Sequence, residues 1–396
     1  MNVPFLNLQR QYESIKEELE SATIEVLRSG AYIGGKYVES FEKSMKEYLD
    51  VKHVVTCSNG TDAIMLALRA FNVGAGDEVI TTPFTFFATA EAIAAVGAKP
   101  VFVDIREEDL NIDPAKIGAA VNANTKAILP VHIFGWPCDM DEINQIAKAN
   151  GLKVVEDAAQ AIGCEYKGRK IGATDNIATF SFYPTKNLGA FGDAGMVTTN
   201  DDNLAIILRA LREHGMAKNG AIARELLHGI SDEFVEEAKE DNLYNPYKYY
   251  NYLIAYNSRL DALQAAILNT KLKYLDGYNS SRQKIAKIYD EGLANVASVP
   301  SEPTYGKSCY HQYAIRSKMK EEMGSFLASK GIGSGAFYPV PLHLQKAFDY
   351  LGYKDGDLPV AERLSKQTVC LPMFPELTRA EIDSVINAIK DFGRGI

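Results

Sequence analysis

Short apolar runs alternate with amphipathic helical patterns over residues 53–212, and this alternation limits the fold more than any other feature of the sequence. Runs of this length that are rich in β-branched residues are typical of strands buried inside a sheet. Strands joined by helices imply right-handed crossovers, a mostly parallel sheet and ligands at the carboxyl ends of the strands. The predicted strands are residues 53–57, 78–82, 100–105, 127–131, 153–157, 177–183 and 195–199, and the predicted helices among them are residues 61–71, 87–96, 139–149 and 201–212.

The segments on either side of this alternation predict a helical start and a second domain. Helical periodicity at residues 12–26 and 38–48 indicates an N-terminal helical segment, residues 1–50. A long excursion, residues 216–250, carries an acidic run and a tyrosine-rich run and is expected to hold its own helix. The remaining patterns are a long connector helix over 259–293, a strand at 309–317, and helices at 321–329 and 379–392. We therefore expect a large domain of residues 1–255 and a small C-terminal α/β domain of residues 256–396.

Charge and cysteine content exclude several classes of function. The 396 residues carry a net charge of −9, with a pI near 5.4, which argues against general nucleic-acid binding. The five cysteines are scattered without a CxxC pair, so neither a disulfide framework nor a zinc site is expected. No apolar run reaches membrane-spanning length, and no secretory leader is recognisable at the start. These features predict a cytoplasmic protein without a metal site.

Two residues of opposite charge, Asp157 and Lys186, form the first candidate site. Asp157 ends a predicted buried strand, and Lys186 lies 29 residues later, in a glycine-flanked loop after the next one. Alone, such an aspartate is usually a helix cap, and such a lysine is usually a surface residue. Together they supply what a pyridoxal phosphate (PLP) enzyme requires. The amine holds the cofactor as a Schiff base, and the carboxylate keeps the ring nitrogen protonated.

A segment that fits a phosphate group, Ser58-Asn59-Gly60-Thr61-Asp62, lies between a predicted strand and a predicted helix. Gly60 lets the backbone approach a ligand, and the helix start offers free N–H groups and a positive dipole. Ser181 could add its hydroxyl. The segment is neither a Walker loop nor a GxGxxG fingerprint, which argues against nucleotide triphosphatases and dinucleotide oxidoreductases. The aromatic segment 82–87 could stack on a flat ring, although such clusters are more often core.

With these motifs assembled, the chain resembles the DegT/StrS family of PLP-dependent nucleotide-sugar aminotransferases, which have the aspartate aminotransferase fold (fold type I). That fold implies a large domain with a mostly parallel, seven-stranded-type sheet between helices, followed by a smaller α/β domain. The resemblance runs nearly end to end. It rests on PFLNLQRQY, SNGTDAI, GDEVITTPFTFFATAEAI, PVHIFG, VVEDAAQAIG, FSFYPTKNLGAFGDAG, YNSRLDALQAAIL, FYPVPLH and LPMFPELT.

The resemblance implies a role for each candidate site residue. Lys186 would be the Schiff-base lysine and Asp157 the partner of the pyridinium nitrogen. The remaining cofactor contacts would be Gln160 to the phenolic oxygen, Phe86 stacked on the ring, Gly60, Thr61 and Ser181 at the phosphate, and Asn257 at the phosphate of the neighbouring subunit. Tyr338 and His343 match the substrate-side segment of the family. A homodimer with shared active sites follows from the expected role of Asn257.

The reaction implied is transfer of an amino group from an amino acid, expected to be L-glutamate, to a keto sugar on a nucleotide diphosphate. The sequence SNGTDA resembles that of family members that aminate a 3-keto sugar. Asn251 and Ala255 depart from the usual His and Gly, where the neighbouring subunit would approach the sugar. One alternative is a PLP-dependent sugar dehydratase or deoxygenase, a branch with His in place of Lys186. The other is a catalytically silent regulatory protein of the same fold.

Overall fold

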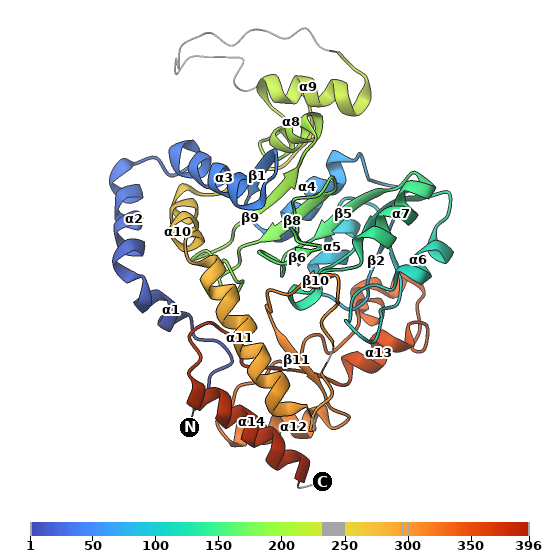
Figure 1. Cartoon of the computed structure of the whole chain (residues 1–396). Coiled ribbons are helices and arrows are strands. Elements are labelled where there is room, and N and C mark those ends of the chain that lie inside the picture. The colour runs from blue at the N-terminus through green and yellow to red at the C-terminus, as the bar shows by residue number, and fades with distance from the viewer. Residues whose placement is uncertain (1, 232–249, 295, 300, 395–396) are drawn as a thin grey trace.

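A seven-stranded sheet lies at the centre of the protein, in a computed structural model that describes residues 2–231, 250–294, 296–299 and 301–394 (Figure 1). Most of the acidic run 231–241 and of the tyrosine-rich run 243–252 lies outside these residues. The sheet consists of β1 (His53–Cys57), β2 (Glu78–Thr81), β3 (Lys99–Phe102), β4 (Thr125–Leu129), β5 (Lys153–Asp157), β8 (Ile177–Ser181) and β9 (Gly195–Thr199).

The strand order is β1-β9-β8-β5-β4-β2-β3, and a single strand, β9, runs against its neighbours. It pairs antiparallel with β1 and β8, whereas the other pairs of this sheet are parallel. Cys57 and Ser181 both pair with Gly195, so the ends of three strands meet at one level. The prediction of a mostly parallel sheet is confirmed.

Side chains of the central strands alternate between two apolar layers, as a sheet covered on both faces requires. Val154 packs into one layer and Val155 into the other. The first layer is closed mainly by α3 (Gly35–Leu49), α6 (Pro114–Ala120), α7 (Met140–Asn150) and α10 (Ala262–Leu272). The second is closed mainly by α4 (Gly60–Ala70), α5 (Ala88–Ala95) and α8 (Asp202–Leu211). The result is a three-layered α/β/α arrangement.

Side-chain caps fix where several helices of these layers begin. Asn59 accepts a hydrogen bond from the Asp62 N–H and starts α4 directly after β1. Asp139 caps α7, and Asp201 caps α8 by accepting from two backbone N–H groups. The start of α4 is thereby fixed at the carboxyl edge of the sheet, where ligands of parallel sheets bind.

The C-terminal part has its own apolar cluster, built by α11 (Leu275–Leu293), β11 (Tyr313–Arg316), α12 (Lys320–Ser329), β12 (Thr368–Leu371) and α14 (Arg379–Arg394). The strands β11 and β12 form an antiparallel pair. The predicted long helix over 259–293 is interrupted at Lys273 and Tyr274, which separate α10 from α11. The predicted strand 309–317 is also shorter, because residues 309–311 instead hydrogen-bond the turn at Phe134 and Gly135.

Further differences from the prediction concern short elements. The first helical pattern divides at Ile15 into α1 (Leu8–Ser14) and α2 (Lys16–Ser29). The excursion after residue 215 contains α9 (Ala217–His228), as expected. The sequence patterns do not predict α6, α13 (Pro359–Ser365) or the small sheet formed by β6 (Glu165–Tyr166), β7 (Arg169–Lys170) and β10 (Gly306–Lys307). Two-residue strands are too short to show an alternating pattern.

None of the helices in the described part of the chain is both long enough and apolar enough to cross a membrane.

The close approach at Gly195 generates a prediction for stability. A Cβ added there would lie 2.4 Å from the Asn59 carbonyl oxygen, so Gly195→Ala should lower the free energy of unfolding by about 1–3 kcal/mol. The control is Gly118→Ala in α6, where an added Cβ meets nothing within 4 Å. This change should stabilise the protein by about 0.5–1 kcal/mol. Thermal and denaturant unfolding measure both, and equal effects would contradict the packing argument.

Candidate active site

A cavity of about 410 Å³ opens at the carboxyl edge of the sheet, between the ends of β5 and β8 and the starts of α4 and α5. Ligands of open α/β sheets bind at this edge. All the predicted site residues except Asn257 and His343 line the cavity. Those that line it are Gly60, Thr61, Phe86, Asp157, Gln160, Ser181, Lys186 and Tyr338.

Lys186 lies in the loop between β8 and β9, where its backbone N–H donates to the Tyr183 carbonyl in a turn. Burial lowers the pKa of its amine to about 8, and the charge of Asp157 opposes this by favouring the ammonium form. Far more of this amine is therefore unprotonated near neutral pH than of an exposed lysine. An unprotonated amine is a nucleophile and a base.

Asp157 ends β5, and two donors hold its carboxylate in a fixed orientation. The Ala159 N–H donates to Oδ1 at 3.1 Å, and the Thr89 hydroxyl donates to Oδ2 at 2.8 Å. Burial raises the pKa of Asp157, while these two donors and the nearby Lys186 lower it. A cationic ring nitrogen placed against this carboxylate would favour the ionised form further. Asp157 is thus oriented to bind a cation.

The start of α4 and the end of β8 form a cradle for an anion. A Cβ added to Gly60 would lie 2.7 Å from Ser181 Cβ, so these two segments touch. Asn59 accepts from the N–H groups of Asp62 and Ala63. Among the described residues, the backbone N–H groups of Gly60 and Thr61 find no acceptor. Two free N–H groups beside two hydroxyls suit a phosphate.

Gln160 and Tyr338 form a polar wall on the other side of the cavity. The Gln160 Oε1 accepts the Phe134 N–H at 2.7 Å, so its Nε2 is the end that donates to the Tyr338 hydroxyl, at 2.9 Å. Burial raises the pKa of Tyr338, which stays a neutral phenol. Phe86 lies at the mouth with 59% of its surface exposed and its ring centroid 6.3 Å from that of Tyr338. Its face is therefore available to a planar ligand.

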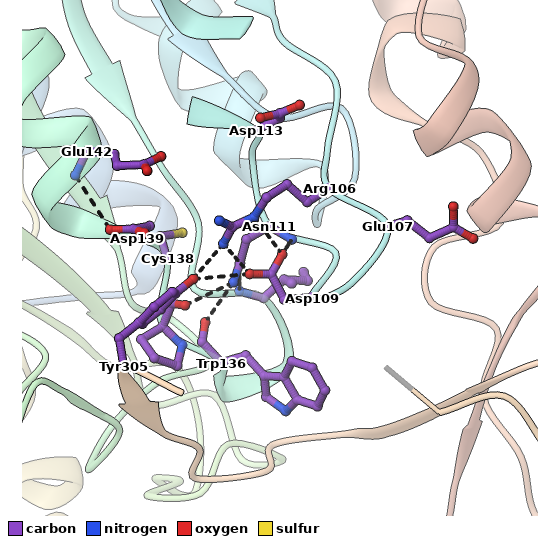
Figure 2. Close-up of polar contacts among 12 residues, drawn as sticks. Arg106, Glu107, Asp109, Asn111, Asp113, Trp136, Cys138, Asp139, Glu142 and Tyr305 are labelled. Atoms are coloured by element: carbon purple, nitrogen blue, oxygen red, sulfur yellow. Dashed lines mark hydrogen bonds and ion pairs between the residues drawn. The ribbon is translucent and has the colours of Figure 1, made fainter. Parts of the chain in front are cut away.

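A polar network outside the cavity supports the turn that holds Gln160 (Figure 2). Asn111 accepts the Ile133 N–H at 3.2 Å and donates to the Pro137 carbonyl at 3.1 Å. Asp109 accepts the Asn111 N–H and pairs with Arg106. Tyr305 completes the network. Asn111 thus holds the chain before and after the turn at residues 133–135. This fixes the Phe134 N–H, which is the donor to Gln160.

The two remaining predicted residues lie elsewhere. His343 is buried, and its Nε2 lies 3.0 Å from Glu362 Oε1, outside the cavity lining. Asn257 forms a backbone bridge with Glu213 and does not line the cavity of its own chain. The expected contact of Asn257 with a second subunit stays a prediction.

His311 lines the cavity and was missed by the sequence analysis, which interpreted residues 309–317 as a strand. Its Nδ1 lies 3.2 Å from Asn187 Oδ1, which can only accept, so Nδ1 carries the proton. Burial and the charges of Lys186 and Arg282 lower its pKa well below the usual range, so the imidazole is neutral. A histidine inside an aromatic run, CYHQY, was the available signal. Thr89 was missed because it lies within a run of small residues.

The arrangement suits organic chemistry on a bound cofactor. It joins a cation-binding carboxylate, an anion cradle and a buried amine in one cavity. Among the described residues, no cluster of His, Cys, Asp or Glu is suited to hold a metal ion.

Comparisons with known proteins agree with this geometry. The profile of the DegT/DnrJ/EryC1/StrS aminotransferase family matches residues 13–390. A "pleiotropic regulatory protein" from Geobacillus stearothermophilus is 46% identical over 398 residues, which cover 100% of this chain and 99% of the relative. The dTDP-3-amino-3,4,6-trideoxy-alpha-D-glucose transaminase of Streptomyces venezuelae is 38% identical over 396 residues, 100% of this chain and 97% of the relative.

Among solved structures, S. venezuelae DesV in complex with a ketimine intermediate superposes with a TM-score of 0.90 at 38% identity. The match covers 100% of this chain and 99% of that one. The fold is that of fold type I PLP aminotransferases, as the sequence resemblance implied. The chain therefore belongs to the DegT/DnrJ/EryC1/StrS aminotransferase family and is a PLP-dependent sugar aminotransferase.

Proposed function

We propose that this enzyme transfers the amino group of L-glutamate to a 3-keto sugar carried on a nucleotide diphosphate. The observation that carries the proposal is the meeting of Lys186 and Asp157 in one cavity, with the anion cradle beside them. The position on the sugar is supported by the S. venezuelae relative, whose name specifies a 3-amino sugar. The SNGTDA segment at the start of α4 supports the same position.

The residues of the cavity fit PLP. Asp157 would hold the ring nitrogen, and Gln160 would donate to the phenolic oxygen. The free N–H groups of Gly60 and Thr61, with the Ser181 hydroxyl, would hold the phosphate. When bound, PLP withdraws electrons from the substrate carbon that carries the amine, so that this carbon can lose a proton.

Lys186 is the group that moves this proton. With a pKa near 8, its unprotonated amine can take the proton from the α-carbon of the amino-acid donor. The donor would leave as a keto acid whose new carbonyl oxygen comes from water, and its amine would be retained by the bound cofactor. In the second half of the reaction, Lys186 returns a proton to the sugar carbon that receives the amine. Tyr338 and Gln160 orient the reacting groups from the opposite wall.

The alternative from the sequence, a catalytically silent regulatory protein, has a parallel in the name of one relative. The Geobacillus stearothermophilus relative is named for pleiotropic regulation, not for catalysis. Against it, the buried amine, the oriented carboxylate and the anion cradle are all present here. The dehydratase alternative is disfavoured by Lys186 itself, because that branch has His at this position.

The sugar can be tested directly. Enzyme loaded with pyridoxamine phosphate is mixed with individual keto-sugar nucleotides, and the visible absorbance of the lysine-bound PLP is followed. We expect the absorbance to return with 3-keto sugars and not with 4-keto sugars. Return with 4-keto sugars alone would refute the proposed position. No return with any sugar, in enzyme that glutamate had bleached, would refute the sugar acceptor.

Replacing the lysine tests the catalytic role. Lys186→Ala should lack the yellow colour of the wild-type protein and should lose about 10²–10⁴-fold in turnover through the missing base alone. Excess glutamate should bleach the wild type. The control is Lys346→Ala, whose side chain is 94% exposed and should leave both readouts unchanged. Full turnover by Lys186→Ala would contradict the proposal.

The pH dependence of PLP capture follows from the lowered pKa of Lys186. Because the free amine is the nucleophile, the capture rate of cofactor-free enzyme should rise with pH, with a midpoint near 8, and then level off. Asp157 raises the pKa of Lys186, so Asp157→Asn should move the midpoint below that of the wild type. Stopped-flow absorbance measures the rate. A midpoint near the ordinary lysine value of 10.5 would contradict the burial argument.

We further propose a homodimer in which Asn257 completes the neighbouring active site. Phe86 and Tyr183, both at the cavity, are 59% and 52% exposed, and Phe191 of the same loop is 49% exposed. Exposed aromatic side chains around a polar cavity are typical of a surface that a partner covers. A second copy of the chain would cover them.

Subunit mixing tests the shared site. If Asn257 serves the neighbour, Lys186→Ala and Asn257→Ala subunits form heterodimers with one intact site, and a random mixture regains roughly a quarter of wild-type activity. Each variant alone should be far less active. Heterodimers seen by native mass spectrometry without regained activity would refute a shared site.

A further inference from the structure

The loop that carries Lys186 is attached to the helices behind it by alternate residues. Leu188 and Ala190 are buried in the core layer on that side of the sheet. Asn187, Gly189 and Phe191 instead use polar groups to hydrogen-bond side chains of α10 and α11. Buried apolar residues of the loop therefore alternate with residues that are hydrogen-bonded to the two helices.

Three side chains on α10 and α11, spaced about two turns apart, make these contacts. Gln264 Oε1 accepts the Phe191 N–H at 2.8 Å. Lys271 Nζ donates to the Gly189 carbonyl at 2.5 Å. Asn279 Oδ1 accepts from Asn187 Nδ2 at 2.8 Å. The two helices follow one another in the chain, and α11 leads into the C-terminal part (Figure 1). The contacts with the loop therefore come from both helices.

Lys271 is an unusual choice for its position. It is 1% exposed, and the Gly189 carbonyl is its one hydrogen-bond acceptor among the described residues. Burial lowers its pKa to about 8, with an opposing effect of Glu376. An apolar side chain would avoid the desolvation of an ammonium group at this point. What lysine adds is the bond to the loop. The loop is tightly folded at this point, since a Cβ added to Gly189 would lie 2.3 Å from the Pro184 carbonyl oxygen.

Asn279 connects this loop to the other half of the site. Its Nδ2 donates to the Ile162 carbonyl at 3.0 Å, in the segment that follows Asp157 and Gln160. Its Oδ1 accepts a hydrogen bond from Nδ2 of Asn187, the residue after Lys186. Asn187 also donates to the Cys309 carbonyl at 2.9 Å, and its Oδ1 lies 3.2 Å from His311 Nδ1. Both the nitrogen and the oxygen of this amide therefore have hydrogen-bond partners. The buried side chain of Asn279 thus links the segment that carries Lys186 to the segment that carries Asp157.

We propose that Gln264, Lys271 and Asn279 are positioning residues that hold the loop of Lys186 so that its amine lies where proton transfer with the substrate carbon requires it. The proposal rests on the proposed role of Lys186. None of the three lines the cavity, so they act through the loop and not on the substrate. Proton transfer depends steeply on the placement of the base, and small displacements cost large factors in rate.

Lys271→Met is the main test, and Lys273→Met, in the break directly after α10, is the matched control. Lys273 is 64% exposed and pairs with Glu18 at 2.9 Å, away from the loop. In the PLP-loaded enzyme, Lys271→Met should lower kcat about tenfold or more, because the loop loses its anchor, with little change in KM for glutamate. Lys271→Arg, which keeps a donor and the charge, should restore part of kcat. Lys273→Met should match the wild type.

A neutral substitution makes the test independent of the charge of Lys271. Gln264→Leu removes the acceptor for the Phe191 N–H and changes no charge. We expect the pH midpoint of the visible absorbance to shift in Gln264→Leu relative to the wild type, because the loop that carries Lys186 loses an anchor. If folded Lys271→Met keeps wild-type kcat, or if Gln264→Leu has a wild-type midpoint where Lys271→Met does not fold, the proposal is wrong. A fully active Lys186→Ala would instead refute the role of Lys186 itself.

Discussion

The site depends on one electrostatic relation, that of a buried amine and a buried carboxylate. Burial alone lowers the pKa of Lys186 and raises that of Asp157, so it favours the neutral form of both. The charge of Asp157 raises the pKa of Lys186, and the charge of Lys186 lowers the pKa of Asp157, so each opposes the effect of burial on the other. The amine therefore has a pKa near neutrality while the carboxylate keeps the capacity to bind a cation. Thr89 and the Ala159 N–H donate hydrogen bonds to that carboxylate and fix its orientation in the cavity. The site therefore depends on the direction of the carboxylate as well as on its charge.

The sheet explains why these two groups meet. Asp157 ends a parallel strand, and Lys186 lies on the connection between β8 and the reversed strand β9. Most connections in a parallel sheet pass through a helix, whereas an antiparallel neighbour permits a direct return. The Lys186 amine is thus carried on a loop that leaves the sheet at the end of β8 and returns at the start of β9, both at the edge where the cavity opens. Apolar layers on both faces of the sheet exclude water beneath the cavity.

Much of this arrangement was predictable from the sequence, because the periodicity of buried strands is a strong signal. The seven strands, Asp157 at the end of β5 and Lys186 in its loop follow from local patterns alone. Roles such as that of Gln160 came only from resemblance to the family. His311 was missed because its place depends on a backbone turn at Phe134, far away in sequence. The break between α10 and α11 was missed because residues on both sides of Tyr274 keep helical periodicity.

Gly195 has a consequence for how the protein folds. It pairs with Cys57 on one side and with Ser181 on the other. The position of Gly195 therefore fixes both the strand that leads to the anion cradle and the strand that leads to the loop of Lys186. Cys57 precedes it by well over a hundred residues, and bringing such distant segments together is slow. Until β9 inserts between β1 and β8, neither segment has its final neighbour. The active site is therefore complete only when β9 is in place between these two strands.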